Sequence, residues 1–543
     1  MRQTTGAALR SLHTLIVLAM LAPVLSGFDN APEAGAAAAR QEVAEPALRQ
    51  APPAAAAEDA NAYNWRRDEK REPAAVASAG SYRAAAKADA APRQALDWET
   101  GAGKSYLIPA LEVPGFLVLL SAYDRIAYSN QTQDGKKVYS STFSSSWEHL
   151  RKQHWVFDQD PFNINQFGHP YQGATMYGLA RSSGLGFWES LAYSNAGSFL
   201  WKMAGETDPP SINDQITTGN AGSLLGEALF RMAELVLKED GPTPDTWHEV
   251  GAAIISPPTA FNRAAFGDRF KAIFPSQNPA TAWRFQAGSS FNSVTKLDAN
   301  LSFNMSYGLP GKPGYSYRRP MDYFDFKITG QLNKTNPVND VLLRGLLYGR
   351  DYHAGDDYRG IWGLYGSYDY LSPTVFRVST TALSLGTTGQ YWVAPAVALQ
   401  GTLLGGVGFG AAGTTPISSG DRDYHYGVAP QALLALRMLF GDRVALDLDA
   451  RGYYVAGSGR FTNTDSALDQ QGGSETIVRV LTGFNVRVYR RHGVGLQYVE
   501  SIRDSQYGNQ PSKTQRDGTV SLVYTFIGSS HFGAVGWRDE GRH

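Results

Sequence analysis

Residues Leu297–Tyr307, LDANLSFNMSY, alternate strictly between apolar and polar side chains. One face of this segment carries Leu, Ala, Phe, Met and Tyr, and the other carries Asp, Asn and Ser. A period of two is that of a β-strand, in which successive side chains point to opposite faces of the sheet. A two-faced strand of this length also has the dimensions of a tilted strand that crosses a bilayer. The segment therefore predicts a strand of a transmembrane β-barrel.

The same alternation recurs between about residues 280 and 527. It is clear in the segments that begin at Tyr323, Arg443, Glu475 and Thr519. Short turns at 440–443 and 490–493 alternate with longer polar loops. We expect an α+β membrane protein in which residues 280–527 form an antiparallel transmembrane β-barrel of about 12 strands. A soluble β-sandwich is the alternative, but it would point a charged face into its core.

The last strand, TVSLVYTF, is expected to close the barrel. We expect Val520, Leu522, Tyr524 and Phe526 to point outward and strand pairing to end near Phe526 or Ile527. The remaining residues, 528–543, contain too many glycines to form a further membrane strand. We therefore assign 528–543 to a C-terminal tail.

The N-terminus predicts export. Arg2 and Arg10 precede the apolar run Leu15–Ser26, which is typical of a cleaved signal peptide over residues 1–26. The chain has no Cys and a formal net charge of −1, so disulfides are excluded and nucleic acid is not an expected partner. Residues 27–104 are rich in Ala and Pro, and we expect a disordered tail that could reach a periplasmic partner. Together with the barrel, these features predict the outer membrane, with its lipid and the barrel-assembly machinery as partners.

Residues 105–275 predict a helical domain. Three helices are indicated, one after Pro170, one from Phe187 and one around Gly222. Small residues recur four apart in these helices, and this spacing lets helix backbones approach closely. The small residues are Ala174 and Gly178; Ser190, Ser194 and Ser198; and Gly222 and Gly226. A further apolar helix is expected to start near Pro114, too short to span a bilayer.

Most motifs in the chain have a structural explanation. The runs at Gly101–Ser105 and Gly408–Gly413 match fragments of phosphate- and dinucleotide-binding expressions, but neither lies between a strand and a helix. Ser211 and Asp214 have the spacing of a helix capping box. Glu227 and Arg231 are four apart, where a structural ion pair is expected, and their small neighbours predict a buried face that demands further partners.

His169 is the strongest candidate for chemistry. As a general base it would need a carboxylate to orient its ring, and Asp158, Asp160 or Glu189 could serve. Capping or packing is the alternative role of this histidine. A metal site is not expected, because no second His stands at a useful helical spacing, and no cofactor is predicted. The candidate catalytic residues are His169, Arg181, Glu189, Asp214 and Glu227.

The helical region resembles an uncharacterised bacterial family. The resemblance rests on DQDPFNINQFGHPYQGATMYGLARSSGLGFWES, GSFLWKMAGE and PPSINDQITTGNAGSLLGEALFRMA, which occur in this order within about residues 105–270. The family consists of exported, outer-membrane-like proteins that carry a domain of unknown function. The resemblance implies that shared signature positions are Asn165, His169, Gly173, Arg181, Ser198, Glu206, Ser211, Asp214, Gly222 and Glu227. It implies no activity.

Three functions are compatible with these features. The first is an outer-membrane barrel with a periplasmic or lumen-plugging helical domain, in a structural or transport role. About twelve strands leave a narrow lumen, so free conduction as in a wide porin is not expected. The second is an enzyme acting on an envelope lipid or glycan, with His169 as base, Arg181 as anion clamp, and Glu189, Asp214 or Glu227 as supporting carboxylates. The third is an assembly adaptor that uses the N-terminal tail.

Overall fold

The computed structural model describes most of the chain beyond residue 93. It covers 94–528 and Gly533, with gaps at 128–131, 134–135, 138, 153–154, 158–159, 240, 242, 293–295, 332–337, 374, 415–423, 458–471 and 508–509. The predicted signal peptide and most of the two predicted tails lie outside the described residues. Residues 94–104, which we assigned to the disordered tail, are instead packed on the helices. Leu96 is buried, and the Trp98 indole donates to the Ala272 carbonyl and contacts the rings of Phe230 and Phe274.

Twelve antiparallel strands form a closed barrel, as predicted. Each strand pairs with its neighbours in the chain, and β14 closes the barrel on β3 from Thr519–Asn292 to Ile527–Arg284. The strands are β3 Thr281–Asn292, β4 Lys296–Tyr307, β5 Phe324–Gln331, β6 Val338–Ala354, β7 Tyr358–Leu371, β8 Phe376–Ala394, β9 Val397–Thr414, β10 Tyr424–Phe440, β11 Val444–Gly457, β12 Gly473–Tyr489, β13 His492–Tyr507 and β14 Gln510–Ile527. The predicted turns at 440–443 and 490–493 and the end of pairing at Ile527 are confirmed.

The two faces of the barrel wall are as the alternation predicts. Asp369 of β7 points into the lumen, since it pairs with Arg451 of β11, which is not a neighbouring strand. Its neighbours Tyr368 and Tyr370 therefore point outward. On β14, Leu522 is 64% exposed on the outer face, whereas the next residue, Val523, is buried inside. An apolar outer face and a polar inner face are what a membrane barrel requires.

Helices precede the barrel, also as predicted. They are α2 Leu107–Ala127, α3 Phe143–Lys152, α4 His169–Ser182, α5 Phe187–Ala204, α6 Ile212–Ile216, α7 Gly222–Glu239, α8 Thr246–Ile255 and α9 Pro257–Phe266, with π-helical turns η2 Ile164–Gly168 and η3 Thr217–Ala221, the 3-10 turn η4 Gly267–Arg269, and a small hairpin of β1 Thr132–Gln133 and β2 Lys136–Lys137. The expected start of the apolar helix at Pro114 is wrong. The helix begins at Leu107, because Pro109 falls in the first turn, where a proline costs no hydrogen bond, and only Pro114 interrupts the interior.

The predicted close approach of helix backbones is present between α4 and α7. A Cβ atom built on Gly222 would lie 2.7 Å from the Cα atom of Gly173, and one on Gly226 would lie 3.0 Å from the carbonyl oxygen of Ala174. The hydroxyl of Ser194 on α5 donates to the Gly173 carbonyl at 3.0 Å. Glycine and serine thus allow three helices to pack at backbone distance.

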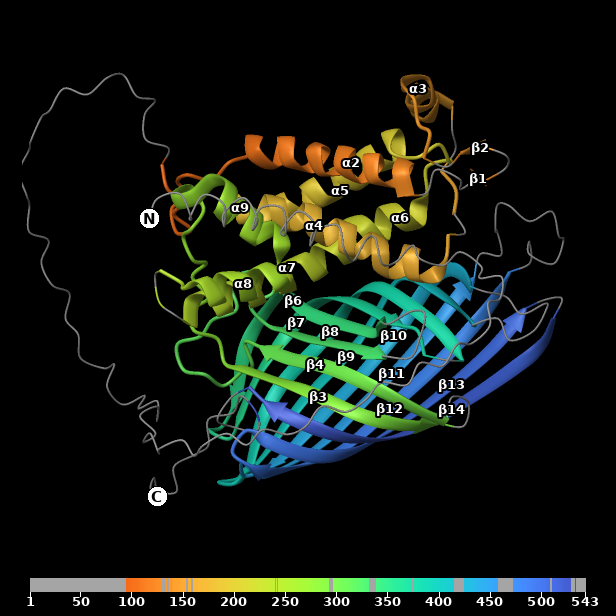
Figure 1. The fold of residues 1–543 in the computed structure, drawn as a ribbon. Coiled ribbons are helices and arrows are strands. Elements are labelled where there is room, and N and C mark those ends of the chain that lie inside the picture. Colours follow the sequence, from red (N-terminus) through yellow and green to blue (C-terminus); the bar gives the residue numbers. More distant parts are fainter. Residues whose placement is uncertain are drawn as a thin grey trace, which may run out of the picture. The chain divides into compact units, whose positions relative to one another are not determined.

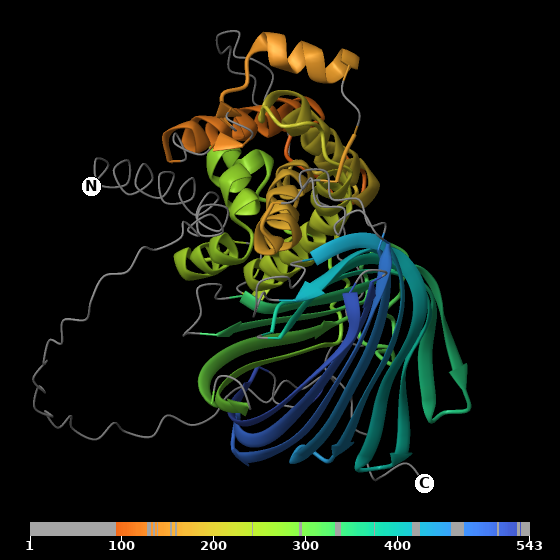
Figure 2. The same cartoon turned by 90° about the vertical axis from the view of Figure 1, so that its right-hand side faces the viewer.

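The helices lie on the outer face of the barrel wall (Figures 1 and 2). At one end of the barrel, Phe162 stacks on the outward-facing Tyr370 and contacts Tyr424 edge-on. At the other end, Arg231 of α7 binds Asp322, which precedes β5. Of the two expected positions of the helical domain, periplasmic or plugging the lumen, the described helices do not take the one in the lumen. Large aromatic side chains on the outer face of these strands form the surface against which the helices pack.

Candidate functional site

The segment before α4 forms the interface between the helices and the barrel. In η2, the Asn165 amide donates to the hydroxyls of Tyr424 and Tyr426, at 3.0 and 2.9 Å, and the Tyr368 hydroxyl donates to the Gln166 carbonyl. These three tyrosines point outward from β7 and β10. The density of aromatic and amide groups in NINQFG is therefore explained first by docking against the barrel wall.

A buried polar cluster surrounds Asp214 at the start of α6. The Asp214 carboxylate lies 2.5 Å from the Lys202 ammonium and 3.5 Å from Nε2 of His169. It also accepts hydrogen bonds from the Ser211 hydroxyl and, at 2.9 Å, from the Asn213 amide. All five side chains are buried. The cluster thus holds one carboxylate among an ammonium, a hydroxyl and an amide, with the His169 ring beside it, which is a stable arrangement for a buried charge.

The structure bears on two expectations about this cluster. Ser211 does precede α6 as its N-cap residue, but its hydroxyl donates to the Asp214 carboxylate and does not cap a backbone N–H. Among the described residues, the carboxylate found beside His169 is Asp214, which we did not name as its partner when we expected Asp158, Asp160 or Glu189. Asp158 lies outside the described residues. Asp214 is 45 positions away in the sequence from His169, so only the folding of α6 against the start of α4 brings the two together.

The cluster contains groups that a hydrolytic site would use, but they are tied to one another. The Lys202 ammonium also lies 2.7 Å from Glu206, and Glu206 in turn accepts from the Trp201 indole. His169 also contacts the amide oxygen of Gln172 through Nδ1, at 3.3 Å. These residues line neither of the two cavities found in the barrel lumen. The geometry therefore favours a structural role, and catalysis by His169 stays a prediction.

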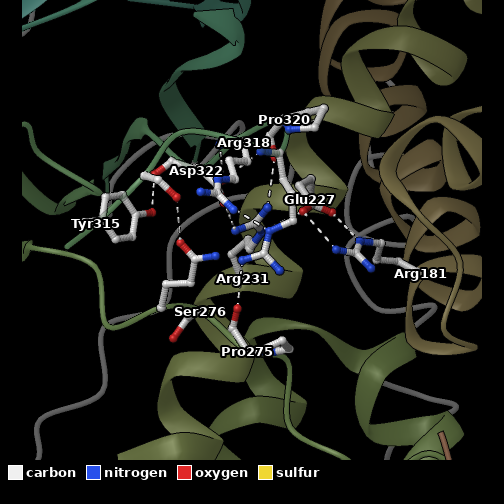
Figure 3. A network of polar contacts seen from close by, with 12 residues as sticks. Arg181, Glu227, Arg231, Pro275, Ser276, Tyr315, Arg318, Pro320 and Asp322 are labelled. Atoms are coloured by element: carbon white, nitrogen blue, oxygen red, sulfur yellow. Dashed lines mark hydrogen bonds and ion pairs between the residues drawn. The ribbon is translucent and has the colours of Figure 1, made fainter. Parts of the chain in front are cut away.

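A second buried cluster surrounds Glu227 on α7 (Figure 3). The Glu227 carboxylate accepts from Arg181 at 2.8 Å, from Arg231 at 2.6 Å and from the Tyr177 hydroxyl at 2.7 Å. Arg231 continues to Asp322 at 3.0 Å, so the chain of contacts runs from α4 through α7 to the barrel. The predicted Glu227–Arg231 pair and its need for further partners are confirmed.

Aromatic rings complete the second cluster. The Arg181 guanidinium lies 4.6 Å from the ring centre of Phe230 and 4.7 Å from that of Phe274. Phe274 also contacts Arg231 at 4.6 Å, and its backbone N–H donates to Glu234. Rings of this kind stabilise a guanidinium where water is absent. No sequence pattern pointed to Phe274, because it lies in the connection between the helices and β3.

The five candidate catalytic residues do not form one site. His169 and Asp214 share the first cluster, and Arg181 and Glu227 share the second. Glu189 is elsewhere, where it accepts from the Gly186 N–H at 2.6 Å and pairs with Lys104 at 3.2 Å. Since His169 and Arg181 begin and end the same helix, their backbones are about 18 Å apart by helical rise. An anion held by Arg181 would be out of reach of His169.

The barrel lumen is filled by its own side chains. Ion pairs cross it between strands that are not neighbours: Arg451 binds Asp369 at 2.8 Å, and Arg479 binds Asp340 at 3.0 Å. An apolar cluster occupies one side of the lumen and consists of Leu342, Leu371, Phe376, Val378, Ala412, Ala429, Tyr453, Val455 and Ile477. The described part of the barrel is therefore obstructed, which agrees with the expected narrow lumen.

Two cavities are found inside the lumen between the described residues, of about 150 Å³ and about 80 Å³. The larger cavity is lined at one end of the barrel by residues such as Ala282 and Ile527, and the smaller one reaches Asn292 and Asn339 at the other end. Four residues line both cavities and so separate them: Lys327, Arg479, Leu481 and Gln497.

Lys327 differs from the other cations of the lumen. Arg284 and Arg437 share Asp447, Arg344 pairs with Asp325, Arg451 with Asp369 and Asp449, and Arg479 with Asp340. Among the described residues, Lys327 forms no ion pair. Lys327 thus lines both cavities as a cation with no carboxylate within ion-pair distance among the described residues.

A family model matches part of the helical region. Residues 154–258 match the model of a family described as a domain of unknown function, DUF3943, which confirms the resemblance to an uncharacterised family. Among curated proteins, none matches the sequence.

Solved structures similar to this chain include outer-membrane porins and channels. The NanC porin has 7% identity and a TM-score of 0.24, and the alignment covers 45% of this chain and 98% of that one. The channel DcaP of Acinetobacter baumannii has 9% identity and a TM-score of 0.21, covering 46% and 96%. OmpT of Vibrio cholerae has 10% identity and a TM-score of 0.18, covering 46% and 98%.

Proposed function

We propose that the chain is an outer-membrane protein whose barrel passes small anions through a narrow, obstructed lumen. The observation that carries this proposal is Lys327, a cation without an ion pair among the described residues, placed where two lumenal cavities meet. Both cavities are much smaller than the roughly 300–1,000 Å³ of typical small-molecule sites, so the solute is of ionic size. Charged side chains in a constriction select ions of the opposite sign.

The cross-lumen ion pairs restrict this passage. The Arg479–Asp340 pair stands beside Lys327 at the boundary of both cavities, so a solute passes only when these side chains move. We therefore expect a low conductance with frequent closures. Export by a cleaved signal peptide and insertion by the barrel-assembly machinery belong to the same proposal.

Conductance across a planar bilayer tests the proposal. The full chain should give small, anion-selective currents in a chloride gradient, and Lys327→Glu should shift the reversal potential toward cations. Arg490→Glu is the matched control, because this residue is exposed at the turn between β12 and β13 and its substitution changes the charge equally. A chain that conducts no ion at any potential would contradict passage and leave a structural role for the barrel.

A further inference from the structure

Helix α2 is apolar on its exposed face as well as on its buried face, which is not expected for a helix on the surface of a soluble domain. Its acidic residues Glu112 and Asp124 face the protein, and Asp124 is only 1% exposed. Its exposed positions other than Arg125 in the last turn are apolar, and they are Leu107, Ala110, Leu111, Gly115, Val118, Leu119, Ala122, Ile126 and Ala127. A soluble helix buries its apolar stripe and exposes its charges.

The neighbouring helix α5 continues this apolar surface. The Tyr193 hydroxyl of α5 donates to the Tyr106 carbonyl beside the start of α2, at 2.6 Å. The exposed positions of α5 are again apolar, and they are Trp188, Ala192, Ala196, Phe199, Leu200 and Ala204. Trp188 stacks on the outward-facing Tyr348 of β6, with ring centres 5.9 Å apart. The apolar surface of the helices is therefore continuous with that of the barrel.

Helix α2 runs in the direction that joins the two ends of the barrel. Its start is tied to the end of α4 by the Ser105 N–H, which donates to the Ser183 carbonyl at 3.1 Å. The beginning of α4 follows η2, which docks on the barrel at the opposite end through Tyr368 and Tyr424. The 21 residues of α2 span about 30 Å, which is also about the thickness of the hydrocarbon core. Within the described residues, α2 is the helix long and apolar enough to cross a membrane.

We propose that the helical domain lies within the membrane beside the barrel, and that the exposed faces of α2 and α5 contact lipid acyl chains. The inference rests on the proposed membrane insertion of the barrel. The helices cover its outer flank from end to end, so a barrel in the bilayer carries them at the same depth. Two charged clusters of the domain are enclosed as a bilayer requires, since Glu227 and Asp214 meet their cations in the interior.

Cysteine accessibility tests this placement, because the chain contains no Cys. Val118→Cys on α2, which is 68% exposed, and Ala196→Cys on α5 probe the helices. Leu522→Cys probes the barrel face, and Asp268→Cys, at a fully exposed side chain, reports access from water. The full-length variants are reconstituted in phosphatidylethanolamine–phosphatidylglycerol vesicles and labelled with a charged maleimide. A bimane label is then quenched by phosphatidylcholine that carries a nitroxide on its acyl chain.

The expected result is that the Val118→Cys and Ala196→Cys variants label at least tenfold more slowly than the Asp268→Cys variant. Both should also be quenched as strongly as the Leu522→Cys variant. Rapid labelling of both helical positions with a protected barrel position would overturn the placement of the helices and leave the barrel in the membrane. Rapid labelling of the Leu522→Cys variant as well would instead reject membrane insertion. Ala192→Cys replaces any α5 variant that does not assemble.

Discussion

At the scale of single residues, the helical domain depends on carboxylates that are surrounded by donors. Glu227 meets two guanidinium groups and one hydroxyl, and Asp214 meets Lys202, His169, Ser211 and Asn213. Both carboxylates are fully buried. Each buried cation is therefore stabilised by its anion, and each anion by its cations. Enclosed ion clusters of this kind hold elements together where water cannot compete.

Glu227→Gln should destabilise the domain by about 3–5 kcal/mol, because it leaves Arg181 and Arg231 buried without their common anion. Chemical unfolding followed by tryptophan fluorescence would measure the loss. Glu239→Gln is the control, since Glu239 is exposed at the end of the same helix and its change should stay within about 0.5 kcal/mol. Equal stability of the two variants would show that the cluster contributes little.

The residue scale also shows where prediction from sequence succeeds. The Glu227–Arg231 pair follows from a four-residue spacing on one helix, so local geometry is sufficient. The His169–Asp214 contact joins two helices, and Arg231–Asp322 joins a helix to the barrel. Such contacts depend on tertiary packing, for which neither spacing nor residue type provides a signal.

At the scale of elements, small residues determine how closely the helices approach. A Cβ atom built on Gly173 would lie 1.8 Å from the Thr218 carbonyl oxygen, so the two backbones cannot keep their separation with any larger residue. The recurrence of small residues was readable from the sequence. The start of α2 was not, because Pro114 would usually begin a helix and here lies within one.

Gly173→Ala should destabilise the packing of η3 and α7 on α4 by about 1–3 kcal/mol, because the added methyl group forces the helices apart. Gly115→Ala is the matched control on α2, where a Cβ atom would have no neighbour within 4 Å. The control should be neutral or stabilising by up to about 1 kcal/mol, since Ala favours helix. Thermal unfolding measured by circular dichroism would compare the two, and a less stable control would refute the packing argument.

At the scale of the whole molecule, the barrel was predictable and the position of the helices was not. Apolar and polar residues alternate along the sequence of each strand because one face of the strand lines the lumen and the other points outward. An outward tyrosine that contacts lipid looks the same in sequence as Tyr368 or Tyr424, which contact helices. Both environments are apolar with a polar margin, so residue type does not distinguish them.

Leu522→Asp should impair insertion of the barrel, because the charge would face lipid at a cost on the order of 2 kcal/mol. Ser302→Asp should be tolerated, since Ser302 lines the smaller lumenal cavity. The fraction of heat-modifiable protein on gels measures insertion for both. Equal tolerance of the two substitutions would contradict the assignment of the faces.

Closure of the barrel depends on the end of β14, which pairs with β3. Phe526 pairs with Phe285 of β3, and its ring centre lies 6.1 Å from that of Trp283. Pairing ends at Ile527 opposite Arg284, and the Gly528 N–H donates to the Trp283 carbonyl at 2.8 Å. Truncation after Gly528 should therefore preserve the closing register and leave assembly unchanged.

Phe526→Ser should reduce assembly, because it removes an aromatic ring from the seam while every ladder hydrogen bond stays available. Tyr454→Phe is a control for an aromatic change on the outer face away from the seam, at an exposed residue of β11. Heat-modifiable mobility and protease resistance of the reconstituted chain would measure the outcome. If truncation after Gly528 abolished assembly while Phe526→Ser did not, the closing contacts would lie beyond β14, and residues 529–543 would be part of the barrel.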